Sequence, residues 1–229
     1  MERHFHEQLE TLKQQLIDMA MAVEEAIASA IEALIKRDNH MADQVMNRDE
    51  HINRMEIDID EICLKLLALQ QPMAIDLRFV TSAMKLNNDL ERIGDHAVNI
   101  AQLAKALNYN DPLKPFINIP RMAEIAQRMV KQSIDSFINA DMTLAKKVCE
   151  QDDEVDLFDD QLFRELITYM FSDPKNIPRA LNYVLVSKNL ERIADLSTNI
   201  AEEVIFIYHA KNIKHHAGRA SIGDIRSRS

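Results

Sequence analysis

Glycine, cysteine and tryptophan are scarce or absent in this sequence. Its 229 residues include three glycines, two cysteines and no tryptophan. A sheet protein of this length would need many glycine-containing turns, so the scarcity of glycine favours an all-α fold. Two cysteines are too few for the disulfide framework of a small secreted domain. The first residues do not resemble a signal peptide, and no apolar run approaches the roughly 18 residues of a membrane-spanning helix. We therefore expect a cytoplasmic protein.

The charge balance is acidic, with a formal net charge of −10. Nucleic-acid binding as the main role is disfavoured, because contact with phosphates requires a basic surface. An acidic surface fits the binding of cations or of basic protein partners instead.

Prolines divide the chain into long segments whose apolar residues recur every three or four positions, as in amphipathic helices. Asp38 and Asp141 precede two of these segments and are suitable N-cap residues. The pattern predicts helices over residues 5–34, 41–69 and 76–107, a shorter one from 120 to 137, and two more over 142–171 and 177–208.

One segment of the sequence occurs twice. Leu-Glu-Arg-Ile-Gly-Asp-His-Ala-Val-Asn-Ile-Ala begins at Leu90, and a copy that retains most of its residues begins at Leu190. Earlier positions also correspond, such as Asp38 with Asp141. We therefore predict two tandem antiparallel three-helix bundles related by internal duplication, with repeats at 1–110 and 116–210. The basic remainder, 211–229, lacks apolar periodicity and is predicted to be disordered.

Each copy of the repeated segment places acidic and amide side chains on one helix face, at positions i, i+4 and i+8. These residues are Glu91, Asp95 and Asn99 in the first half, and Glu191, Asp195 and Asn199 in the second. The helix before each copy carries its own acidic row: Asp49, Asn53, Glu56 and Asp60 in the first half, and Asp152, Asp156 and Asp159 in the second. Such oxygen ligands suit magnesium, manganese, calcium or iron. The alternative is a solvated face whose acids pair with neighbouring basic residues.

The duplicated Leu-Glu-Arg-Ile-(Gly/Ala)-Asp, the following Asn-Ile-Ala and the segment from Gln70 to Arg78 resemble the PhoU family. These are accessory proteins of the phosphate-specific transport system. The resemblance implies two three-helix bundles that hold iron, zinc, manganese or magnesium, as mononuclear or multinuclear sites. It also implies a non-enzymatic negative regulator of the phosphate-starvation response.

The partners implied by the resemblance are the ATPase side of the phosphate ABC transporter and a sensor histidine kinase, with a homodimer as the common assembly. Contact with the membrane would arise only through these partners. Carried onto this chain, the motif ligands are Glu91, Asp95, Glu191 and Asp195, and the further candidates are Asp49, Asn53, Asp152 and Asp156. His96 in the first copy is Leu196 in the second, so His96 is either an additional ligand or an inter-helix histidine.

The two alternatives to a metal-binding regulator are a di-metal enzyme and a metal-free adaptor. A di-metal carboxylate oxidase in a four-helix bundle uses Glu-x-x-His, and none of the eight histidines has an acid three residues before it. No phosphate-binding glycine loop or nucleophile motif suggests another enzyme. A metal-free helical adaptor, whose acids bind basic surfaces, stays open.

Overall fold

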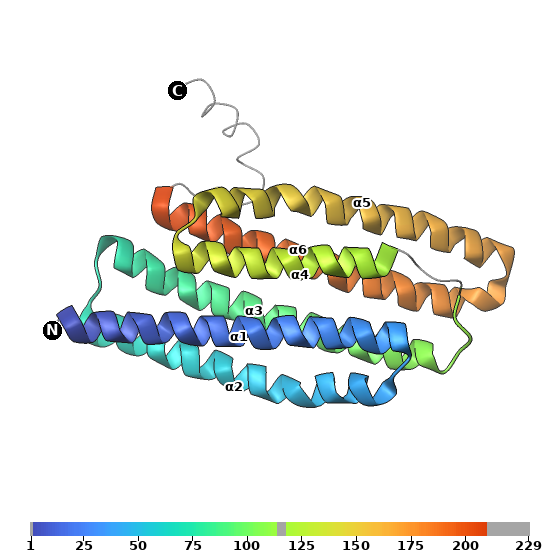
Figure 1. Ribbon diagram of the computed structural model, residues 1–229, viewed down its shortest axis with the longest axis horizontal. Helices are drawn as coiled ribbons and strands as arrows, with labels where there is room; N and C mark the ends of the chain where they lie inside the picture. Colours follow the sequence, from blue (N-terminus) through green and yellow to red (C-terminus); the bar gives the residue numbers. More distant parts are fainter. Residues whose placement is uncertain (1, 114–117, 210–229) are drawn as a thin grey trace, which may run out of the picture.

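The computed structural model describes residues 2–113 and 118–209, and side chains from Phe5 to Tyr208 within that range. The described residues form helices and no strands. The helices are α1 (Glu2–Lys36), α2 (Asn39–Gln70), α3 (Ala74–Asn108), α4 (Asn118–Asn139), α5 (Met142–Ser172) and α6 (Ile177–His209), with a short 3₁₀ helix at Pro174–Asn176. Figure 1 shows two three-helix bundles lying side by side, so the predicted fold is confirmed. The predicted tail, 211–229, lies outside the described residues.

The first turn of each bundle is built from the same local chemistry. Arg37 and Ala140 each have a φ of 57°, which reverses the chain after α1 and after α4. Asp38 then accepts hydrogen bonds from the backbone N–H groups of His40 and Met41, and Asp141 accepts them from two residues at the start of α5. Both aspartates are thus the N-caps that the sequence predicts, and they satisfy donors that a helix start leaves unpaired.

Apolar stripes hold each bundle together and also join the two bundles. Leu12, Leu16 and Met19 of α1 are fully buried in the core. Between the bundles, α1 lies against α4 and α3 lies against α6 (Figure 1). The rings of Phe79 on α3 and Phe137 on α4 stack with centroids 4.8 Å apart. The core is therefore continuous across both halves, which fixes the motif-bearing helices α3 and α6 next to each other.

Within the described range, no helix combines the length and the apolar character needed to cross a membrane.

Candidate functional site

The first acidic cluster lies where α2 packs against α3. Burial raises the pKa of Glu91 above its ordinary value, and the nearby carboxylates of Asp95, Glu56 and Asp49 raise it further. The pKa of Asp49 is also raised, mainly by burial, while a hydrogen bond from Asn53 opposes the rise and Asp95 adds to it. These shifts show that the acids of two different helices share one electrostatic environment. The structure therefore brings Asp49 and Glu56 of α2 within electrostatic range of Glu91 and Asp95 of α3.

Two oxygen atoms of the first cluster are buried without a hydrogen-bond donor. Asn53 Nδ2 donates to Asp49 Oδ2 over 3.2 Å. The other carboxylate oxygen, Asp49 Oδ1, and the amide oxygen Asn53 Oδ1 have no hydrogen-bond partner. Buried oxygens without a donor are costly, and a cation beside them would remove that cost. The donor set consists of carboxylate and amide oxygens, which fits a hard cation.

Nearby arginines of the first half do not neutralise this cluster. Arg48 pairs with Glu25, Arg54 pairs with Glu50, and Arg92 lies 3.5 Å from Asp89. Within the residues that the structure describes, no lysine or arginine forms an ion pair with the cluster acids, which are Asp49, Glu56, Glu91 and Asp95. The first cluster therefore has no ion-paired counterion in this part of the chain, and the charge of Arg92 only partly opposes the rise in the pKa of Glu91.

The second acidic cluster lies at the matching place between α5 and α6. Burial raises the pKa of Asp156 above its ordinary value, and Glu191 and Asp195 are the next largest causes. Asp159 is buried and accepts hydrogen bonds from Ser187 and from Lys188. The second cluster thus repeats the geometry of the first, since acids from two adjacent helices again lie together.

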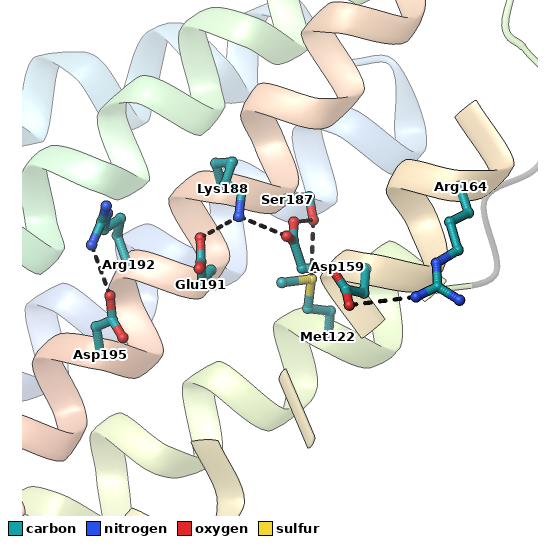
Figure 2. Close-up of polar contacts among 9 residues, drawn as sticks. Met122, Asp159, Arg164, Ser187, Lys188, Glu191, Arg192 and Asp195 are labelled. Carbon is teal, nitrogen blue, oxygen red and sulfur yellow. Dashed lines mark hydrogen bonds and ion pairs between the residues drawn. The ribbon is translucent and has the colours of Figure 1, made fainter. Parts of the chain in front are cut away.

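Basic side chains enter the second cluster, unlike the first. Lys188 Nζ lies 2.7 Å from Asp159 Oδ2 and 2.9 Å from Glu191 Oε2. Arg192 Nη1 lies 3.0 Å from Asp195 Oδ2. Figure 2 shows Lys188 reaching between the two carboxylates it pairs with, while Arg192 and Asp195 form a separate pair further along α6.

The remaining predicted residues are less closely grouped. Asp152 and Asn199, together with Asp195 of the second cluster, line a cavity of about 690 Å³ beside α3, and Thr198 in its wall has a buried hydroxyl without a hydrogen-bond partner. Asn99 is exposed on α3, one helical turn beyond Asp95.

His96 is an inter-helix histidine, which is one of the two roles that the sequence allows for it. Its Nδ1 lies 2.9 Å from the Oδ1 atom of Asn189 on α6, so the side chain faces the other bundle. His96 therefore joins α3 to α6.

No complete coordination sphere is present in the described residues: no three histidine, cysteine, aspartate or glutamate side chains converge as a bound ion requires. Metal binding thus stays a prediction, which the donor chemistry and the two unpaired oxygens of the first cluster fit. Sequence reasoning did not single out Lys188. The available signal was its alignment with Asn88, which shows a cation in one repeat and an amide in the other.

Taken together, the fold and the sites define a duplicated helical protein with one acidic cluster in each half. The family model described as "PhoU domain" matches residues 16–104 and matches again at 119–204. The chain belongs to the PhoU family.

Relatives support this assignment over most of the chain. A PhoU homologue from Aquifex aeolicus, named a phosphate-specific transport system accessory protein, is 46% identical over 91% of this chain and 94% of its own length. The homologue of the same name from Pseudomonas aeruginosa is 38% identical over 93% of this chain and 88% of its own length.

Solved structures agree with the fold. The crystal structure of PhoU from Pseudomonas aeruginosa superposes with a TM-score of 0.87, at 38% identity, over 90% of this chain and 100% of that chain. The phosphate transport system regulatory protein PhoU from Streptococcus pneumoniae gives a TM-score of 0.86, at 29% identity, over 92% of this chain and 99% of that chain.

Proposed function

We propose that this protein is a cytoplasmic, non-enzymatic negative regulator of phosphate uptake and phosphate-starvation signalling. It would dock on the ATPase side of the phosphate ABC transporter and on a sensor histidine kinase, as a homodimer. The observation that carries the proposal is the family match in both repeats, with relatives named as accessory proteins of phosphate transport. The acidic surface suits basic docking segments on such partners.

The acidic clusters are proposed to hold iron, zinc, manganese or magnesium. In the first half the ligands would be Glu91 and Asp95 of α3, with Asp49 and Asn53 of α2. A bound cation would supply charge neutralisation between the helices. Side chains from both helices would supply the oxygen ligands, so the helix pair would be stiffened and its outer surface kept ready for docking. Ligand binding to the folded state alone also raises stability by mass action.

The metal content of the untagged full-length protein tests the metal part of this proposal. Elemental analysis should find metal in the wild-type protein. The double variant Glu91→Ala/Asp95→Ala should lose the metal of the first half while circular dichroism stays helical. The matched control is Glu50→Ala/Glu61→Ala, which removes two exposed acids of the same helical bundle and should keep the full metal content. Equal metal content in the cluster variant and the wild type would contradict the assignment.

A reporter assay tests the regulatory part. A strain lacking the gene should express a phosphate-starvation reporter even in phosphate-rich medium, and the wild-type gene should silence it. Failure of the wild-type gene to silence the reporter would contradict the regulatory role.

A metal-free adaptor is the second candidate function. The absence of a converged ligand group among the described residues favours it. In that case the cluster acids would contact basic partner surfaces directly, and the Glu91→Ala/Asp95→Ala variant would lose partner binding although the wild-type protein contains no metal.

A further inference from the structure

One of the basic side chains in the second acidic cluster, Lys188, joins acids of two helices, and the first cluster has Asn88 at the corresponding position. We propose that Lys188 is a tethered counterion of the second cluster, which makes the second cluster a weaker site for divalent cations than the first. Lys188 aligns with Asn88, because both precede a Leu-Glu-Arg-Ile motif by two residues. The inference rests on the metal binding proposed above and deepens it, since it ranks the two sites.

Lys188 is positioned to compete with a metal ion for ligands. Its ammonium group lies 2.7 Å from Asp159 and 2.9 Å from Glu191, so it joins the α5 acidic row to the α6 motif. Asp159 is buried and also accepts a hydrogen bond from Ser187. A divalent cation could use these carboxylates only by displacing charge-assisted hydrogen bonds and approaching a like charge.

The first cluster presents the opposite situation. Asn88 places no charge at the corresponding position, and the acids of this cluster form no ion pair within the described part of the chain. Asp49 Oδ1 and Asn53 Oδ1 are buried without donors. A cation would therefore gain oxygen ligands here without displacing a basic side chain. The first cluster should fill at lower metal concentration than the second.

Manganese titration of the untagged full-length protein tests this ranking. Calorimetry and the electron paramagnetic resonance signal of free Mn²⁺ should reveal two classes of site that differ in affinity by about tenfold or more, the scale of one displaced charge-assisted interaction. Glu91→Gln should abolish the tight class. Lys188→Asn should tighten the weak class by a similar factor, and Asn88→Lys should weaken the tight class.

Two further variants separate charge from packing. Lys188→Arg keeps the positive charge and should keep the weak class weak. Lys65→Asn removes a lysine that pairs with Glu61 on the surface, and it should change neither class. Asn88→Lys tests the idea even if Lys188→Asn does not fold, since it adds a charge and removes no ion pair.

The outcomes distinguish this inference from the metal proposal itself. If Mn²⁺ binds in a manner that Glu91→Gln abolishes, yet Lys188→Asn and Asn88→Lys leave both classes unchanged, the role of Lys188 is overturned while the metal proposal survives. Two sites of equal Mn²⁺ affinity in the wild-type protein would also overturn the role of Lys188. If no Mn²⁺ binds to the wild-type protein at all, the metal proposal and this inference fall together.

Discussion

At the scale of single residues, burial controls the chemistry of the cysteines. Cys63 on α2 is completely buried, and Cys149 on α5 is partly buried. Burial raises the pKa of the Cys63 thiol to about 12, with a smaller contribution from Asp60, and burial likewise raises the pKa of Cys149 to about 12. Both therefore remain protonated thiols at neutral pH, which suits a packing role rather than a nucleophilic one.

We predict that both thiols resist modification in the native protein. An aromatic disulfide reagent at pH 8 should react at least about a hundred times more slowly with the native protein than with the unfolded chain, because a thiol with a pKa of about 12 holds far less thiolate at this pH than an ordinary thiol. The folded state binds more protons than the unfolded state above the ordinary thiol pKa. The free energy of unfolding should therefore fall as the pH rises from about 9 toward 12. Rapid labelling of the native protein at pH 8 would contradict this.

At the scale of helix pairs, a glycine and its neighbour are matched in size. A methyl group on Gly94 of α3 would lie 3.3 Å from Ile52 Cδ1 on α2. In the second repeat the corresponding residues are Ala194 and Val155, both buried, so the position of the glycine has gained a methyl group and the position of the isoleucine has lost one. The two pairs thus contain the same number of side-chain carbons, divided differently between the two helices, as expected for close-packed positions.

A double-mutant cycle should show this complementarity. Ile52→Val alone should cost about 1 kcal/mol because it leaves a small cavity. Gly94→Ala alone should be close to neutral, since a gain of about 1 kcal/mol in helix propensity is offset by the tight contact. In urea unfolding, the free energy of unfolding of the double variant should be higher by about 0.5–1 kcal/mol than the value obtained by adding the effects of the two single substitutions. Strict additivity would mean that the two side chains do not share this space.

At the scale of the whole molecule, a buried carboxylate connects the two bundles. Glu203 of α6 is 2% exposed and accepts a 3.0 Å hydrogen bond from Ser82 of α3. The ammonium of Lys85 on α3 contacts both oxygens of Glu203 at 3.1 and 3.0 Å. Further along the same interface, Arg78 Nε donates to the backbone oxygen of Ile207 over 3.0 Å. These polar contacts add to the apolar packing of α3 against α6, the two helices that carry the repeated motifs.

Removing the cation from this contact should destabilise the whole protein. Lys85→Met should lower the free energy of unfolding by about 2 kcal/mol, because a buried carboxylate loses its charged partner while half-exposed Lys85 loses little itself. The double variant Lys85→Met/Glu203→Leu should recover most of that loss. Lys65→Met, which breaks an exposed pair with Glu61, should cost less than about 0.5 kcal/mol. If Lys85→Met and Lys65→Met lower the free energy of unfolding by similar amounts, the buried ion pair stabilises the protein no more than the exposed one.

The sequence by itself determined the helices, the duplication and the acidic face of each motif. Periodicity and caps such as Asp38 and Asp141 depend on residues within about one helical turn, so they can be predicted from local pattern. The row containing Glu91 and Asp95 follows from the same spacing. Only the tertiary structure decided that Lys188 bridges Asp159 and Glu191, and that His96 faces Asn189.

The physical reason is that a charged side chain has many possible partners in the sequence, and the packing of the helices decides which of them it contacts. Glu203 is one of many acids in the sequence, and its burial depends on Ser82 and Lys85, which lie more than a hundred residues earlier. A flexible lysine such as Lys188 can reach several acids, and the packing of α5 against α6 selects two of them. Local chemistry thus specified the elements, and contacts between distant segments specified how the charges of the two clusters are balanced.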